Sequence, residues 1–171
     1  MKNFDKGLEN KDAFIGEMMR APAPPPAHQL IVQNLLLQLH GLVNERYFVL
    51  QAPCDLQLSE LNFRQPDLML IKRSRVDIIQ SHAVTAPPDI IIEVLSPTSK
   101  ALDCNVKLRQ YAAFGIPEYW IVDLEKQQIM HYLLTPACTV YNEPNIYHAN
   151  SSLYSSQLGG TLFKVASLFS F

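Results

Sequence analysis

The sequence has little cysteine and almost no net charge, and these two shortages exclude several kinds of protein. Its three cysteines, Cys54, Cys104 and Cys138, are odd in number and far apart, so they match neither a disulfide framework nor a zinc-binding pattern. The formal net charge is −2 at pH 7, which provides no overall basic field for nucleic acid or an anionic membrane but leaves a local basic patch open. We expect reduced thiols in a cytoplasmic protein.

Long hydrophobic runs are also missing. No apolar stretch approaches the roughly 20 residues that cross a bilayer, and residues 1–14 lack the apolar segment of a signal peptide. We therefore expect no membrane partner. Hydrophobic residues make up 48% of the 171 residues, which is enough for one full core. We expect a flexible lead-in over residues 1–12 and a single domain over residues 13–171.

The apolar residues are spaced as in strands that alternate with helices. The run PDIIIEVL, residues 88–95, is rich in branched side chains and predicts a central strand buried on both faces. A predicted helix from about 98 to 114 and a strand at 118–123 follow, in the order of a right-handed parallel crossover. The sequence thus predicts an α/β fold with a mixed sheet. The other predicted elements are a strand over 14–21, a helix over 27–43, two strands within 46–58 and a strand over 66–71. An antiparallel edge follows, with an alternating strand over 127–134 and short strands near 138–142 and 161–165.

Three charged residues lie where this pattern predicts apolar structure. Asp67 opens one strand, Glu93 lies near the carboxyl end of the central strand, and Lys107 lies in the following helix. A buried carboxylate needs a partner, and Mg²⁺ or Mn²⁺ prefers oxygen ligands. If the two strands are neighbours, such an ion would polarise a phosphate and activate a water. Lys107 would hold that water or neutralise the phosphate, so the pattern indicates a metal-assisted phosphodiester hydrolase.

Each of these residues also has a structural explanation. Asp67 fits a turn at a strand entrance. Glu93 could pair with a buried Arg109 instead of a metal. Lys107 could pair with Asp103, four residues earlier on an exposed helix face.

Further candidates are weaker. Glu17 could reach the site as an additional acid or be a solvated strand residue, and His28 could join the site or cap a helix. Asp103 is an ordinary first-turn acid that could also join the site. The one dense basic cluster could contact phosphates or be solvated. It consists of Lys72, Arg73 and Arg75.

Several blocks of the sequence, in order, resemble the Uma2 family of endonucleases, the DUF820 group. The matching positions are Gly16-Glu17, His28, Pro66-Asp67, residues 88–100, Asp103, Lys107, Tyr111 and residues 115–123. The resemblance implies a branch of the PD-(D/E)xK superfamily, with the restriction-endonuclease-like fold and with Asp67 and Glu93 as metal ligands. The lysine of the general superfamily pattern is replaced by Leu95. The family's pattern places a lysine in the following helix instead, at Lys107.

We therefore expect an endonuclease that depends on Mg²⁺ or Mn²⁺ and acts on nucleic acid, with DNA as the expected substrate rather than RNA. Its catalytic residues would be Asp67, Glu93 and Lys107. One rival is a noncatalytic nucleic-acid-binding or regulatory protein with the same fold, which the low net charge and Leu95 favour. Another is a scaffold for oligomer contacts. A homodimer or higher homo-oligomer is expected, because cutting both strands of a duplex uses two sites and the helix over 28–43 is apolar enough to bury against a twin.

Overall fold

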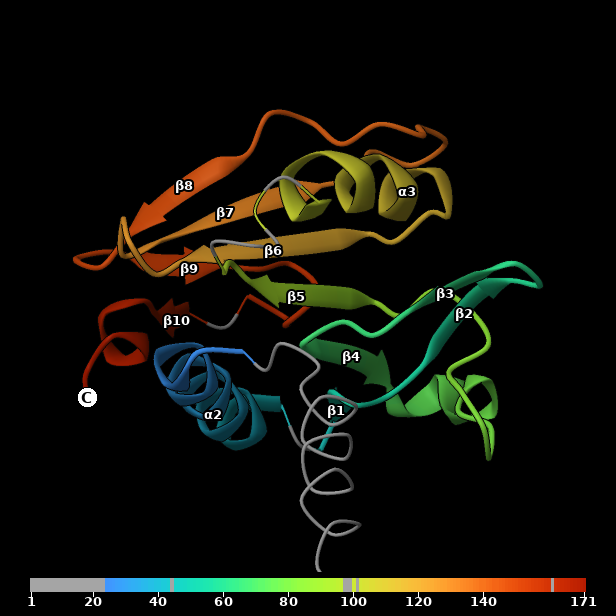
Figure 1. Ribbon diagram of the computed structural model, residues 1–171, viewed down its shortest axis with the longest axis horizontal. Coiled ribbons are helices and arrows are strands. Elements are labelled where there is room, and N and C mark those ends of the chain that lie inside the picture. The colour runs from blue at the N-terminus through green and yellow to red at the C-terminus, as the bar shows by residue number, and fades with distance from the viewer. Residues whose placement is uncertain (1–23, 44, 97–99, 101, 161) are drawn as a thin grey trace, which may run out of the picture.

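A six-stranded sheet forms the centre of the molecule. The computed structural model describes residues 24–43, 45–96, 100, 102–160 and 162–171 (Figure 1). The strand order is β1-β4-β5-β6-β7-β8, with β5 and β6 parallel and the other neighbours antiparallel. The predicted mixed sheet is thus confirmed. The strands are β1 (Tyr47–Gln51), β4 (Leu68–Lys72), β5 (Ile90–Val94), β6 (Glu118–Asp123), β7 (Gln128–Leu133) and β8 (Asn145–His148). The predicted lead-in over 1–12, the strand over 14–21 and Glu17 lie outside the described residues.

The strand β5 lies inside the sheet, as its sequence predicts. All five of its residues are buried, and so are all six residues of β6. Branched side chains fill both faces of such strands, since each face is covered by other elements. A π-helical segment, η2 (Leu102–Lys107), and the short helix α3 (Leu108–Ala113) connect β5 to β6. The predicted parallel crossover is therefore present.

Different elements cover the two faces of the sheet (Figure 1). On one face lies α2 (Pro26–Val43), whose Ile31, Leu35 and Leu39 are fully buried at helical spacing. The small sheet of β9 (Ser152–Tyr154) and β10 (Leu162–Lys164) packs into the same core. On the other face, Tyr111 and Ala112 of α3 pack against β4, β5 and β6. None of the described helices combines the length and apolarity needed to cross a membrane.

Short elements were the hardest to predict. The expected strand near 138–142 is absent: Val140 is exposed, and Tyr141 is buried with its hydroxyl donating to the Ile116 carbonyl. The β-branched residues of this segment, Thr139 and Val140, are therefore not part of a strand. The hairpin of β2 (Leu56–Ser59) and β3 (Asn62–Arg64) is a separate two-stranded sheet that the sequence pattern did not resolve beyond one short strand.

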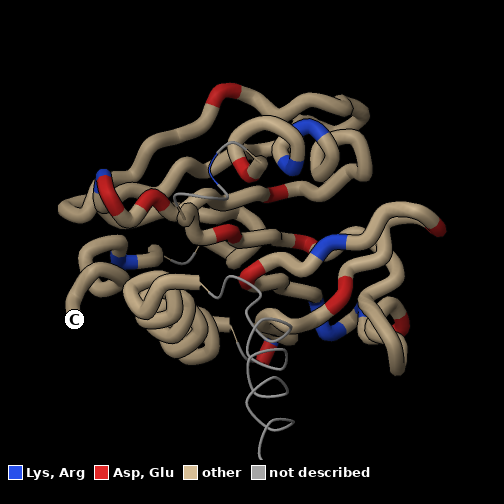
Figure 2. Tube along the Cα trace, in the orientation of Figure 1, with Lys and Arg blue, Asp and Glu red and all other residues tan. Residues whose placement is uncertain are grey.

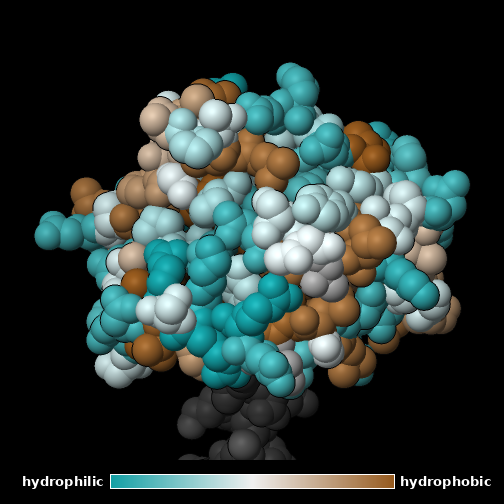
Figure 3. Space-filling model, turned by 180° about the vertical axis from the view of Figure 1, so that it is seen from behind, coloured by the Kyte–Doolittle hydropathy of each residue, from teal (hydrophilic) through white to brown (hydrophobic). Residues whose placement is uncertain are grey.

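Charged residues are spread over the fold rather than gathered on one surface. Figure 2 shows Asp and Glu both near the middle of the view and on outer loops, with Lys and Arg on several separate elements. Two members of the basic cluster are held by buried Asp89, whose carboxylate lies 3.3 Å from Lys72 Nζ and 3.2 Å from Arg75 Nη1. Seen from behind, the hydrophobic residues form separate patches between hydrophilic ones (Figure 3). These views agree with the small net charge of −2.

A buried polar cluster ties the C-terminal segment to the sheet. The Glu118 carboxylate accepts hydrogen bonds from Ser155 Oγ at 2.8 Å, Trp120 Nε1 at 3.1 Å and the Gln157 amide at 3.3 Å. His131 Nε2 lies 3.1 Å away. Burial works to raise the pKa of Glu118, but the bonds from His131, Ser155 and Trp120 outweigh it and hold the pKa below its ordinary value. Glu118 is therefore a charged anchor.

Replacing Glu118 with Gln is expected to lower the free energy of unfolding at neutral pH by about 3 kcal/mol, because the partners of the buried carboxylate lose its charge. A lowered folded-state pKa contributes stability that is present above the unfolded value of 4.5 and is lost as the pH falls through the folded pKa. The variant should therefore lose less stability in acid than the wild type. Urea unfolding from about pH 3 to pH 7 measures both effects.

Glu125→Gln is the control for this experiment, because the Glu125 side chain is 78% exposed. A Glu118→Gln protein as stable as this control across the pH range would contradict the role of the cluster.

Candidate active site

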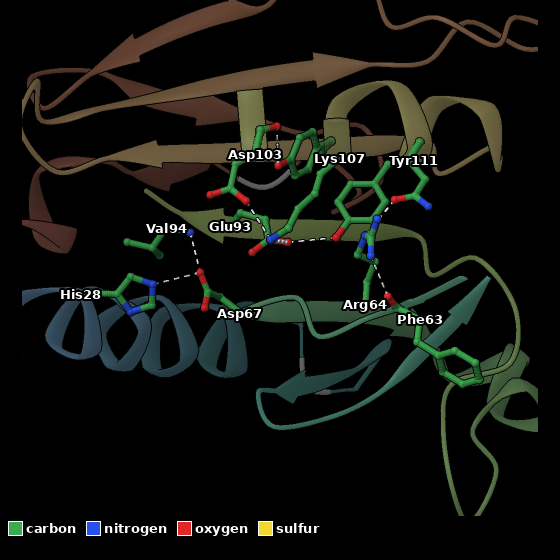
Figure 4. Close-up of polar contacts among 11 residues, drawn as sticks. His28, Phe63, Arg64, Asp67, Glu93, Val94, Asp103, Lys107 and Tyr111 are labelled. Carbon is green, nitrogen blue, oxygen red and sulfur yellow. Dashed lines mark hydrogen bonds and ion pairs between the residues drawn. The ribbon is translucent and has the colours of Figure 1, made fainter. Parts of the chain in front are cut away.

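Asp67 and Glu93 face each other across neighbouring strands. In the antiparallel pair of β4 and β5, Leu68 lies opposite Ile92. Extending this register by one residue sets Asp67, just before β4, opposite Glu93, and opposed residues share a face of the sheet. Figure 4 shows the two carboxylates near one another between α2 and the crossover segment. The requirement that their strands be neighbours is thus met.

Asp67 is held from the α2 side of the sheet. Its Oδ2 accepts a hydrogen bond of 2.7 Å from the Val94 amide and lies 3.1 Å from His28 Nε2. His28 is buried in the first turn of α2. Burial works to lower the pKa of His28, but the hydrogen bond and charge of Asp67 outweigh it and raise the pKa above its ordinary value of 6.5. A protonated His28 would pair with the carboxylate.

Glu93 is held from the opposite side. Its Oε1 accepts hydrogen bonds from Lys107 Nζ at 2.8 Å and from the Tyr111 hydroxyl at 2.9 Å, while Arg109 is exposed and is not its partner. The Glu93 side chain is 4% exposed. Burial is the main cause that raises its pKa to about 7; the charges of Asp67 and Asp103 also raise it, against the lowering effect of Lys107.

Lys107 lies between two acids. Its Nζ is 2.7 Å from Asp103 Oδ1 as well as 2.8 Å from Glu93 Oε1. Because Asp103 is 1% and Lys107 11% exposed, this pair does not lie on an open helix face. Burial works to lower the pKa of Lys107, but Glu93 and Asp103 outweigh it and raise the pKa, so the side chain stays an ammonium. Both Asp103 and Lys107 belong to η2, and π-helical turns are frequent at functional sites.

The acids at this site are few, but they are of the kind that a divalent metal requires. No group of three or more His, Cys, Asp or Glu side chains gathers to hold a metal within the described part of the chain. Mg²⁺, however, is usually bound through one or two carboxylates, with waters and substrate phosphates as further ligands. Asp67 and Glu93 fit that role. Burial, together with the charges of Asp67 and Asp103, keeps the pKa of Glu93 raised despite Lys107, and a cation bound there would offset this effect.

Two residues near the acids had no assigned role in the sequence. Tyr111 donates to Glu93, and its spacing of four from Lys107 and eight from Asp103 was the signal that places all three on one helical face. Arg64, at the end of β3, lies beside Tyr111 in Figure 4. No spacing rule relates Arg64 to the crossover helix. Leu95, in the lysine position of the general superfamily pattern, is buried in the core below α3.

Comparison with known proteins identifies relatives of the chain. Residues 10–162 match the model of the family Uma2, described as "Putative restriction endonuclease". The fold is similar to the crystal structure of a protein described as "a putative nuclease belonging to DUF820" from Anabaena variabilis ATCC 29413, with a TM-score of 0.70 and 17% sequence identity. The match covers 86% of this chain and 83% of that one, which confirms the predicted restriction-endonuclease-like α/β fold. No curated protein matches the chain.

The raised pKa of Glu93 predicts a pH-dependent stability in the absence of metal. A folded-state pKa of about 7, above the ordinary 4.5, means that the contribution of this group is complete below pH 4.5 and is lost as the pH rises through about 7. Glu93→Gln should remove this loss, which is on the order of 3 kcal/mol. Urea unfolding in EDTA between about pH 4 and pH 8 measures it. Parallel pH profiles of the variant and the wild type would show that Glu93 has an ordinary pKa.

Proposed function

Because this chain belongs to the Uma2 family, we propose that it is an endonuclease that uses Mg²⁺ or Mn²⁺ to hydrolyse phosphodiester bonds in nucleic acid. DNA is the proposed substrate rather than RNA. The observation that carries the proposal is the convergence of two carboxylates from neighbouring strands beside a buried ammonium group. Lys107 Nζ lies 2.8 Å from Glu93 Oε1, and Asp67 is the residue opposite Glu93. A buried acid with a raised pKa beside a specific charge partner, as Glu93 is beside Lys107, is typical of catalytic sites.

Asp67 and Glu93 are the residues that would hold the metal. When bound, the ion would polarise the phosphate and make a bound water more acidic. The chain's own groups orient these ligands: His28 and the Val94 amide hold Asp67, and Tyr111 holds Glu93. Ligands fixed in this way by neighbouring hydrogen bonds need less reorganisation on metal binding.

Lys107 is proposed to act as an ammonium group and not as a base. The raised pKa of Lys107, which Glu93 and Asp103 cause against the effect of burial, keeps its proton in place at neutral pH. An ammonium group can hold the attacking water through a hydrogen bond and can offset the negative charge that grows on the phosphate. Asp103 is the residue that orients it, at 2.7 Å.

The rival is a nucleic-acid-binding protein that keeps the fold without catalysis. The observation that favours it is the pairing of Glu93 with Lys107, which already supplies the acid with a cation. The two candidates differ in metal binding. Calorimetry with Mn²⁺ should show binding that strengthens as the pH rises through about 7, the pKa of Glu93, if the endonuclease proposal is right.

Cleavage of supercoiled plasmid in Mn²⁺ tests the endonuclease directly. Asp67→Asn and Glu93→Gln should each lower the cleavage rate by about 1,000-fold, because a removed ligand charge weakens metal binding and transition-state stabilisation. Lys107→Met should lower it by roughly 100-fold. Glu125→Gln, an exposed residue with the same change of type, should cut as the wild type does.

Equal cleavage by the Glu93→Gln and Glu125→Gln proteins would point to a contaminating nuclease. If the wild type binds DNA but neither cuts it nor binds Mn²⁺, the rival proposal is the right one.

We also propose a homodimer that uses the outer face of α2. Leu37 is 65% exposed and Leu162 60%, and together they border a hollow of about 300 Å³ beside Gly41. The space above Gly41 is open, since an added Cβ would have no atom within 4 Å. This space leaves room for a side chain from a second copy. Two copies would supply one site for each strand of a duplex.

Leu37→Lys should convert this dimer to a monomer, because a two-fold contact would bury one unpaired ammonium group from each copy. Light scattering coupled to gel filtration measures the mass. The control is Leu61→Lys, since Leu61 is 92% exposed in the β2–β3 turn. An unchanged mass for Leu37→Lys, or a monomeric wild type, would contradict the proposed contact.

A further inference from the structure

Arg64 is fixed next to the candidate active site. It is the last residue of β3, three residues before Asp67. Its Nε donates to Gln110 Oε1 at 2.8 Å, and its Nη1 donates to the Phe63 carbonyl at 2.9 Å. Figure 4 shows the side chain extending from the hairpin toward Tyr111, on the side of the sheet that carries Lys107.

A chain of hydrogen bonds sets the position of this guanidinium group. Gln110 Nε2 donates to Asn62 Oδ1 at 2.9 Å, and Asn62 Nδ2 donates to Ser59 Oγ at 2.7 Å. Gln110 precedes Tyr111 in α3, so the network joins the hairpin to the helix that contacts Glu93. An arginine held in this way has lost much of its rotamer freedom before any ligand arrives, which reduces the entropic cost of binding.

The charge of Arg64 acts on the site but lacks an acidic partner. Its guanidinium works to lower the pKa of Tyr111, against the stronger effects of burial and Glu93, so the positive charge lies close to that hydroxyl. Within the described residues, no carboxylate forms an ion pair with Arg64 and its Nη2 makes no hydrogen bond. By contrast, Lys72 and Arg75 are engaged by Asp89.

We propose that Arg64 binds a phosphate of the substrate backbone beside the phosphodiester that is cut, and so positions the nucleic acid over Asp67 and Glu93. The proposal rests on the proposed nuclease function. A guanidinium group suits this task because it presents several donors in one plane to the oxygens of a phosphate. Phosphate contacts of this kind fix the register of a protein on the strand without reading its sequence. Gln110 is then a positioning residue that acts through Arg64.

The salt dependence of DNA binding separates this role from a structural one. Binding of a labelled duplex is measured by fluorescence anisotropy in EDTA, so that no strand is cut, over a range of KCl concentrations. Each phosphate contact contributes about 0.9 to the slope of log K against log salt concentration. Because this slope is negative, Arg64→Ala should reduce its magnitude by about 0.9 and weaken binding roughly tenfold. Arg64→Lys should keep the slope, because it keeps the charge.

Two further variants complete the test. Arg109→Ala removes the same charge from an exposed position of α3 and should leave the slope unchanged. Gln110→Ala should weaken binding about threefold with the slope retained, since the guanidinium remains but is less well oriented. In Mn²⁺, Arg64→Ala should raise KM more than it lowers kcat.

The outcomes distinguish this inference from the function on which it rests. A wild type that binds and cuts DNA, together with an Arg64→Ala slope equal to that of the wild type, would overturn the role of Arg64 alone. An equal loss of slope in Arg109→Ala and Arg64→Ala would also overturn it, because the effect would then reflect net charge. A wild type that neither binds nor cuts would overturn both proposals. Binding without cleavage would overturn the nuclease function, and a change of slope in Arg64→Ala but not in Arg109→Ala would then still support a phosphate contact at Arg64.

Discussion

The burial of Glu93 is the constraint on which the rest of the site depends. Glu93 belongs to a strand whose five residues are all buried, and a carboxylate in such a place requires partners. Its hydrogen-bond donors Lys107 and Tyr111 come from the segment that connects β5 to β6. The crossover therefore does more than join two parallel strands. It brings an ammonium group and a hydroxyl over the acid that its first strand carries into the core.

The two faces of the sheet supply different parts of the site. Asp67 lies at the entrance of β4, where it is reached by His28 from the α2 side and faces Glu93 across the strands. Lys107 and Tyr111 come from the α3 side, where the hairpin also brings Arg64. The site is thus assembled where β4 begins and β5 ends, with groups from both layers, so its geometry depends on the packing of each layer against the sheet.

Two buried glutamates in the neighbouring strands β5 and β6 differ in a way that matches different tasks. Glu118 is surrounded by donors, and the hydrogen bonds from His131, Ser155 and Trp120 outweigh burial and lower its pKa, so it is a satisfied structural anion. Burial raises the pKa of Glu93 to about 7, with Asp67 and Asp103 adding to the effect. Burial dominates at Glu93 even with Lys107 beside it, so this carboxylate is the one whose charged form a bound cation would stabilise.

The sequence by itself determined the central strand, the helix that follows it and the two acids, because apolar periodicity and charges out of place are local signals. It also supplied Lys107, whose spacing from Asp103 sets both on one helical turn. Tertiary structure alone decided that Lys107 bridges Asp103 and Glu93, that His28 reaches Asp67, and that Arg64 meets α3. These contacts join residues from different layers, and no local pattern encodes which layers pack together or which way a short hairpin such as β2–β3 folds.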